Sequence, residues 1–305
     1  MNDPSLDVVV IGAAGVDTNI FLAGGDVDFS VEANFAQNLD YVGGAGGYSS
    51  RGFARLCKRT AFIGYVGDDH NGRFLAGELA ASGIETTLFI DPAGTRRSVN
   101  IMYRDGRRKN FYDGRGAMHV RADPQACKHV MSRAHLAHFT IENWTRHLLA
   151  PAKELGLIIS CDLQDVVSPD DPYRADYVAQ ADILFFSSTN FSDPSDLIAG
   201  FLDAGPARVV VAGMGNRGCA LGTRHAGVRF FDPVSLEEPV IDTNGAGDGL
   251  AAGFLSSYCL DGYSLEDSIL RGQIVARYTC TQKADSSHLI SMAQLDEYFL
   301  RMRST

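Results

Sequence analysis

Asp242-Thr243-Asn244-Gly245-Ala246-Gly247-Asp248 forms a turn of small and polar residues between an apolar pair and a helical run. The pair is Val240-Ile241, and the helical run begins at Gly249. A helix that opens with small residues leaves its first backbone N–H groups without intrahelical partners. These donors and the helix dipole together attract an anion, and glycines allow a phosphate to approach the backbone closely. The pattern therefore predicts a phosphate site at the start of this helix.

Asp248 falls in the first turn of the same predicted helix, beside the anion site. A carboxylate in this place is a candidate general base for a hydroxyl group that attacks the bound phosphate. An isolated Gly-x-Gly-Asp is more often a simple turn with a favourable charge at a helix N-terminus. The seven-residue context favours the catalytic interpretation here.

Short apolar runs alternate with helical periodicity along most of the chain. The run at 7–12 is apolar almost throughout, which is typical of a strand buried on both faces of a parallel sheet. Similar runs predict strands at 60–66, 135–140, 157–162, 182–186 and 208–212. Helical patterns lie at 48–56, 72–82, 144–155, 172–179, 194–204, 245–260, 265–282 and 291–302. This alternation predicts βαβ units and a mainly parallel sheet with helices on both faces, which is a three-layer α/β arrangement.

Two segments, 16–42 and 98–112, interrupt the alternation and have the pattern of β-hairpins. The second centres on Asp105-Gly106, a dipeptide that suits a tight hairpin turn. We expect both hairpins to be inserted into the α/β layer as a small accessory sheet, over about 16–42 and 96–115. No composition shift marks a linker, so we expect a single domain over 1–305.

The charge balance and the cysteine pattern limit the kinds of partner. The 305-residue chain has a formal net charge of −10, which argues against non-specific binding of nucleic acid. No apolar run approaches the ~18 residues of a membrane span, and the N-terminus lacks a signal pattern. The six cysteines lie far apart without a C-x-x-C motif, which favours reduced thiols. We expect a cytoplasmic protein without a nucleic-acid or membrane partner.

Four motifs in order resemble the signatures of the ribokinase-like (PfkB) carbohydrate kinases. Residues 242–248 resemble the C-terminal signature, and Gly43–Gly47 resemble the N-terminal di-glycine signature. Gly67–Gly72 resemble the Gly-x-Asp-x-x-Gly that follows it, and Gly213–Gly218 resemble the strand–turn–strand near the nucleotide. The resemblance covers nearly the whole chain. It implies a Rossmann-like (ribokinase-like) α/β sandwich of three layers, with the accessory sheet as a small β-sheet lid over the sugar site. It also implies transfer of the γ-phosphoryl group of ATP to a hydroxyl group of a sugar or sugar derivative.

The resemblance also implies roles for individual residues. Asp248 would be the catalytic base, and the anion hole for charge that develops on the phosphoryl group would be Gly245, Ala246 and Gly247. The residues that would contact the sugar are Asp17, Gly43, Gly44 and Tyr48. A carboxylate such as Asp17 can accept hydrogen bonds from two neighbouring hydroxyl groups, which suits a vicinal diol.

The ligands follow from the same resemblance. ATP would be bound by Gly215, Gly218, Gln273 and Asn244. Mg²⁺ would enter with ATP and bridge its phosphates. Asp242 matches a position that helps bind an activating monovalent cation in many members, so K⁺ is a further candidate, with Ala284 near the loop that completes the site.

Three positions differ from the family pattern. Tyr48 replaces an Asn that hydrogen-bonds the substrate, and a tyrosine there can use its hydroxyl, stack on a ring or fill space. Asn190 replaces a Glu that organises Mg²⁺ and its waters. An amide can still hold a magnesium-bound water, but it adds no charge. Lys283-Ala284-Asp285 replaces a glycine-containing loop near the cation site.

Basic residues are concentrated in the second predicted hairpin. The stretch 96–115 carries seven Lys and Arg against two Asp. Most of them suit the solvated edge of a small sheet, where cations discourage aggregation. Arg96 and Arg97 are the candidates for meeting an anionic substrate.

Other functions and a partner remain open at this point. A nucleoside kinase of the same fold would use Tyr48 and Trp144 as a stacking surface for a base. A non-catalytic sugar- or nucleotide-binding homologue is favoured only by Asn190, and the retention of Asp248 argues against it. A lid sheet with exposed edges also makes a homodimer through the lid an expectation.

Overall fold

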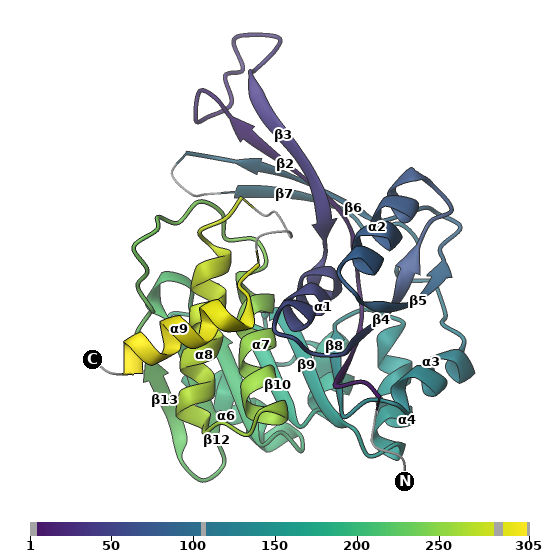
Figure 1. The fold of residues 1–305 in the computed structure, drawn as a ribbon, viewed down its shortest axis with the longest axis vertical. Coiled ribbons are helices and arrows are strands. Elements are labelled where there is room, and N and C mark those ends of the chain that lie inside the picture. Colours follow the sequence, from purple (N-terminus) through teal and green to yellow (C-terminus); the bar gives the residue numbers. More distant parts are fainter. Residues whose placement is uncertain (1–4, 105–107, 284–288, 304–305) are drawn as a thin grey trace.

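The computed structural model describes residues 5–104, 108–283 and 289–303 (Figure 1). Within them, nine strands form the larger sheet in the order β13-β12-β11-β10-β9-β8-β1-β4-β5. The strands from β11 to β5 run parallel, and β12 and β13 add an antiparallel edge. The strand bounds are β1 Val8–Ile11, β4 Thr60–Val66, β5 Glu85–Ile90, β8 Leu136–Thr140, β9 Ile158–Asp165, β10 Ile183–Ser187, β11 Val209–Gly213, β12 Cys219–Thr223 and β13 Gly227–Phe231.

Helices cover both faces of this sheet. Their bounds are α1 Ala45–Arg55, α2 His70–Ala81, α3 Pro124–Met131, α4 Leu149–Glu154, α5 Pro172–Val178, α6 Ser195–Ala204, α7 Ala246–Leu255, α8 Leu265–Thr279 and α9 Met292–Arg303. Alternate residues of β1 belong to the two cores. Val9 and Ile11 join the core with α3–α6, whereas Val8 and Val10 join the core with α1, α2, α7 and α8. The predicted three-layer α/β sandwich is confirmed.

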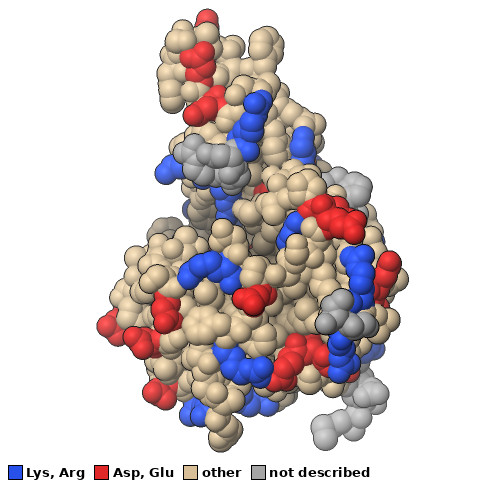
Figure 2. Space-filling view, turned by 90° about the vertical axis from the view of Figure 1, so that its left-hand side faces the viewer, with Lys and Arg blue, Asp and Glu red and all other residues tan. Residues whose placement is uncertain are grey.

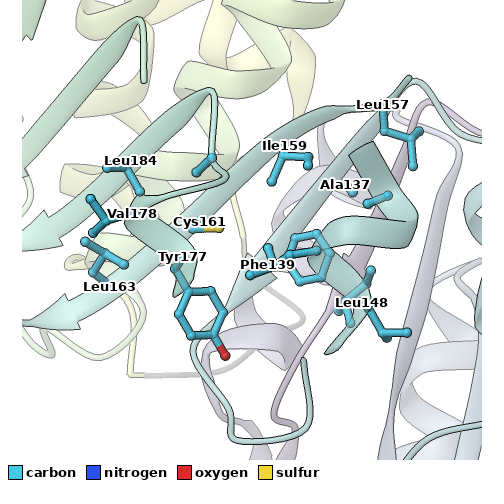
Figure 3. Packing of buried hydrophobic residues seen from close by; sticks show 14 of the residues in the cluster. Ala137, Phe139, Leu148, Leu157, Ile159, Cys161, Leu163, Tyr177, Val178 and Leu184 are labelled. Atoms are coloured by element: carbon cyan, nitrogen blue, oxygen red, sulfur yellow. The ribbon is translucent and has the colours of Figure 1, made fainter. Parts of the chain in front are cut away.

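The core on the α3–α6 face also supports the edge where the site lies. Figure 3 shows Ile159 and Cys161 of β9 in this core, with Tyr177 of α5 beside them. The Tyr177 hydroxyl donates to the Glu142 carbonyl at 2.5 Å and accepts from the Glu142 N–H at 3.1 Å. A core side chain therefore holds the backbone that follows β8.

Four strands form a second, smaller sheet that projects from the body (Figures 1 and 2). They are β2 Gly15–Leu22, β3 Ala36–Gly43, β6 Arg97–Met102 and β7 Arg108–Asp113, in the order β3-β2-β6-β7. We call them the small sheet. β2 and β6 are parallel, and the two other pairs are the predicted hairpins. The predicted Asp105-Gly106 turn lies outside the described residues.

The small sheet has one face toward the body and one face away from it. On the inner face, Asn19, Asn100 and Asn110 are joined by hydrogen bonds across three strands. On the outer face, Thr18 donates to Asp40. Apolar side chains are exposed near the tip and on the outer strand, and these are Phe29, Phe35 and Phe111. The homodimer through this sheet stays a prediction.

Some element predictions were incomplete. The strand β5 was missed because it begins with the polar run Glu85-Thr86-Thr87 at a sheet edge. The short helix α3 was also missed. The helix predicted at 245–260 ends as an α-helix at Leu255, and a π-helical turn follows over Ser256–Leu260. Among the described residues, no helix is both long and apolar enough to cross a membrane.

Candidate active site

Two helix N-termini that begin after a glycine form the frame of the site. Gly44 precedes α1 with φ of 79°, and Gly245 precedes α7 with φ of 74°. A side chain at either position would be strained because the backbone is left-handed. A Cβ atom on Gly245 would also lie 2.7 Å from Cδ1 of Tyr48. The α7 N-terminus is therefore packed directly on the Tyr48 ring of α1.

Asp248 lies in the first turn of α7, as predicted. Its carboxylate accepts a hydrogen bond from the Ser49 hydroxyl at 3.3 Å. Burial raises the pKa of Asp248 well above its usual value, and the negative charge of Asp162 raises it further. Asp162, near the end of β9, has a pKa raised to about 6, again mainly by burial. Ser49 and Asp162 were not among the predicted site residues.

Asp17 lies on β2, on the face of the small sheet that is turned to the body. It is 8% exposed, and burial raises its pKa to about 6. The Tyr48 hydroxyl donates to Asp17 Oδ2 at 3.4 Å. A Cβ atom on Gly43 would lie 2.0 Å from the Asp17 carboxyl carbon, so the first glycine of the di-glycine motif makes room for this carboxylate. The structure thus brings three predicted substrate residues together.

An unpredicted ion pair lies at the edge where β8 ends. Arg96 Nη1 lies 2.6 Å from Glu142 Oε1, and both residues are buried. Burial raises the pKa of Glu142, and the Arg96 charge opposes that shift. The expectation that Arg96 meets an anionic substrate must be revised, because its charge is already paired within the protein. Arg97 donates to the Thr18 hydroxyl at 3.0 Å.

Arg108 of β7 is a basic residue of the small sheet whose charge acts on two carboxyl groups of the site. Its charge lowers the pKa of Asp17 and that of Asp248, against the larger effect of burial on each. A guanidinium that acts on both carboxyl groups lies within electrostatic reach of both. The hairpin cations therefore contribute to the site through a residue that was not singled out.

Asp242 is buried and organises the turn that leads into α7. Its Oδ1 atom accepts from the backbone N–H and from the side-chain amide of Asn244, each at 2.8 Å. Its Oδ2 atom accepts from the Asn19 amide at 2.8 Å. The side chain of Asn244 is thus used within the turn. The proposed partner loop at Ala284 and Asp285 lies outside the described residues, so the potassium site stays a prediction.

The predicted nucleotide residues lie on three separate elements. Gly215 and Gly218 flank a 3₁₀ turn between β11 and β12, with φ of 61° and 85°. A Cβ atom on Gly218 would lie 2.1 Å from the Phe231 carbonyl oxygen, so this glycine is required by packing of the turn. Gln273 is buried in α8. Their contacts with ATP stay predictions.

The ends of β9 and β10 supply oxygen donors of the kind that suit magnesium. Asp162 and Asp165 lie near the end of β9, and Asn190 follows β10. The Asn190 amide donates to the Val166 carbonyl at 2.9 Å, which places its side chain beside β9. Within the described residues, no group of three His, Cys, Asp or Glu could hold a metal ion by itself. Carboxylate and amide oxygens fit an ion that arrives with the phosphates of ATP.

Comparisons with known proteins identify the family of the chain. The family model described as pfkB family carbohydrate kinase matches residues 5–291. Acarbose 7(IV)-phosphotransferase of Actinoplanes sp. is 31% identical over 292 residues, which cover 95% of this chain and 97% of that protein. The solved structure of a microbiome-derived acarbose kinase has a TM-score of 0.89 at 28% identity and covers 97% of this chain and 99% of its own.

A more distant likeness shows the fold. Ribokinase of Arabidopsis thaliana, solved with ribose and ATP, has a TM-score of 0.79 at 19% identity and covers 96% of this chain and 98% of its own. ATP and Mg²⁺ are the expected ligands of the pfkB family of carbohydrate kinases. The chain therefore belongs to the pfkB family of carbohydrate kinases and is an ATP-dependent sugar kinase with a ribokinase-like fold.

Proposed function

We propose that Asp248 is the general base of this kinase and that the backbone N–H groups at 245–247 form its anion hole. The observation that carries the proposal is the position of Asp248 in the first turn of α7. The N-cap of this helix is Gly245, so no side chain caps its backbone N–H groups. Such an N-terminus presents backbone donors to a phosphoryl group beside the carboxylate. The two functions would therefore act on neighbouring atoms.

The proposed step transfers one phosphoryl group and one proton. The acceptor oxygen forms a bond to the γ-phosphorus of ATP, and the bond between that phosphorus and the β–γ bridging oxygen breaks, so that ADP leaves. The acceptor proton passes to Asp248. Magnesium bound to the phosphates would neutralise part of their charge, and the N–H groups would stabilise the charge that develops on the transferred group.

Asp17 would hold the sugar on the opposite side of the site. Its buried carboxylate can accept from two hydroxyl groups of the substrate, and Tyr48 and Gly43 keep it in place. Arg108 extends a positive field to Asp17 and to Asp248. In this arrangement Asp17 would orient two neighbouring hydroxyl groups of the sugar, and a third hydroxyl group would face Asp248.

We propose a sugar derivative rather than a nucleoside as the acceptor. The support is the name of the relative at 31% identity, an acarbose phosphotransferase. Trp144, which a nucleoside kinase would use for stacking, is 1% exposed and packs on Tyr65 at a ring distance of 5.3 Å. A panel of acarbose, ribose, fructose, 2-keto-3-deoxygluconate, adenosine and pseudouridine with ATP tests this choice. Preference for a nucleoside over every sugar would contradict it.

The small sheet would act as a lid within a single domain over 1–305. Its inner face carries Asp17 and Arg108, and Asn19 on the same face is bonded to Asp242 of the body, so in this position the sheet would enclose the acceptor and exclude water. Potassium activation and a homodimer through the small sheet belong to the same proposal. Activity in KCl against tetramethylammonium chloride tests the first, and sedimentation of the purified protein tests the second.

Asp248→Asn tests the central role. Removal of a general base lowers turnover by roughly 10²–10⁴. The matched control is Asp203→Asn, an exposed residue of α6. Steady-state kcat with saturating ATP and sugar is the measurement, and near wild-type turnover in Asp248→Asn would refute the assignment.

A further inference from the structure

A row of three asparagine side chains crosses the inner face of the small sheet and ends on Asp242. The amide nitrogen of Asn110 donates to Asn100 Oδ1 at 2.8 Å. The amide nitrogen of Asn100 donates to Asn19 Oδ1 at 2.8 Å. The amide nitrogen of Asn19 donates to Asp242 Oδ2 at 2.8 Å. The row connects the outermost strand of the small sheet, β7, to the turn before α7.

The carboxylate of Asp242 sets the direction of the whole row. An ionised carboxylate only accepts hydrogen bonds, so Asn19 must turn its NH₂ group toward Asp242. The oxygen of Asn19 is then left to accept from Asn100, and the same constraint passes to Asn110. All three amides therefore share one orientation. Aligned hydrogen bonds of this kind polarise and strengthen one another.

Burial makes the inner part of the row costly to break. Asn19 is 0% exposed, Asn100 is 1% exposed and Asp242 is 2% exposed. A buried amide that loses its hydrogen-bond partner is left without compensation for its lost hydration, so the row favours a single position of each strand relative to the next. Asn110 is exposed and can be changed without opening a core.

Asp242 Oδ1, the oxygen that does not contact Asn19, binds the residue that precedes the proposed anion hole. Oδ1 accepts from the backbone N–H and side-chain amide of Asn244, and Asn244 directly precedes Gly245, the N-cap of α7. The Asn244 amide also lies 3.9 Å from the sulfur of Met102 on β6. The inner face of the small sheet thus meets the turn at two places.

We propose that Asn19, Asn100 and Asn110 are positioning residues through which the small sheet holds the turn at 242–247 in the geometry required for phosphoryl transfer. This inference rests on the proposed function, because it takes 245–247 as the anion hole. The three asparagines act through Asp242. Loss of any link therefore lowers kcat, whereas the KM for ATP changes little.

A double-mutant cycle on kcat tests the row. Asn110→Ala alone lowers kcat by about fivefold, the change that corresponds to one neutral hydrogen bond. Asn19→Ala lowers kcat by more and already disconnects Asn110 from Asp242, so Asn110→Ala added to it has little further effect. If Asn19 and Asn110 acted independently, the fold-losses in kcat of the two single variants would multiply in the double variant. Asn38→Ala, at an exposed position of β3 beside Ile20, is the control and keeps kcat within about twofold.

Amide hydrogen exchange of the unliganded protein gives a readout that does not depend on activity. Exchange at 243–247 becomes faster in Asn110→Ala and in Asn19→Ala, and it stays at the wild-type rate in Asn38→Ala. If Asn19→Ala does not fold, Asn100→Ala takes its place in the cycle because it interrupts the same row. This readout remains valid even if Asp248→Asn shows that the proposed base is wrong.

Three results would overturn the inference. The first is an unchanged kcat in Asn110→Ala. The second is an equal loss from Asn110→Ala in the wild-type and Asn19→Ala backgrounds. The third is unchanged exchange at 243–247 in both single variants.

Discussion

Asp17→Asn is expected to stabilise the unliganded protein at neutral pH while it impairs the enzyme. Burial raises the pKa of the Asp17 carboxyl from 3.8 to about 6 in the folded state. Between these two values the folded state binds more protons than the unfolded state. The free energy of unfolding of the wild type therefore falls as pH rises through this window and stays lowered above it.

The size of the effect follows from the shift. A change of one pKa unit corresponds to about 1.4 kcal/mol, so the ionised Asp17 carboxylate destabilises the fold by about 3 kcal/mol above pH 7. Asparagine has a similar shape and carries no charge, and the hydroxyl of Tyr48 can accept from it as well as donate. We expect a gain of about 1–3 kcal/mol at pH 8 and only a few tenths of a kcal/mol at pH 3.5, where Asp17 is protonated in the folded state and mostly protonated in the unfolded state.

Urea unfolding at pH 3.5, 5 and 8 measures this difference, with Asp203→Asn on α6 as an exposed control. Kinetics with the same variant complete the argument, because loss of charged hydrogen bonds to sugar hydroxyl groups raises the KM for the sugar by about 10-fold or more. A gain in stability that is equal at pH 3.5 and pH 8 would show that burial of the Asp17 charge is not its cause. An equal gain in stability in Asp203→Asn would also show that burial of the Asp17 charge is not the cause.

Three further changes test other parts of the site. Gly43→Ala places a Cβ atom 2.0 Å from the Asp17 carboxyl carbon, so the KM for the sugar should rise by about 10-fold or more while the KM for ATP stays constant in steady-state assays. Gly245→Ala combines a φ of 74° with a contact of 2.7 Å to the Tyr48 ring, so kcat should fall, and Gly245→Ala with Tyr48→Ala should recover part of the loss. Glu142→Gln leaves the buried Arg96 charge unpaired and should cost about 3–5 kcal/mol in urea unfolding, whereas Arg96→Met with Glu142→Leu should cost less. An equal cost in the single and double variants would contradict the role given to the ion pair.

The parts of the site that lie close together in the sequence could be predicted. The anion site at 242–248 could be predicted from the local sequence alone. The first N–H groups of a helix lack intrahelical partners whatever the surrounding fold, and small residues leave them accessible. The alternation of apolar runs with helical periodicity likewise determined the three layers. Gly43 and Asp17 were each predicted from a motif. The structure adds that the glycine is needed for the carboxylate to fit.

Contacts between distant segments could not be predicted in the same way. The asparagines at 19, 100 and 110 share an alternating pattern with polar neighbours at 17, 98 and 108, which was a usable signal for one polar face of the hairpins. The register between β2 and β6 is absent from that pattern, and a slip of one residue would separate the amides. The pair of Arg96 with Glu142 depends in the same way on two segments that only the fold brings together.

The charges around the site explain how an acidic protein can bind ATP. Asp17, Asp162 and Asp248 are carboxyl groups whose pKa values burial raises, and Arg108 is a cation within reach of two of them. In the proposed mechanism, an anionic triphosphate would therefore rely on the backbone donors of α7 and on its own magnesium to approach this edge of the sheet. The same positive charges favour the ionised form of Asp248. In the proposed mechanism, magnesium and Arg108 would therefore oppose the effect of burial and of the negative phosphates on the pKa of Asp248, and they would favour the ionised base where the acceptor hydroxyl lies.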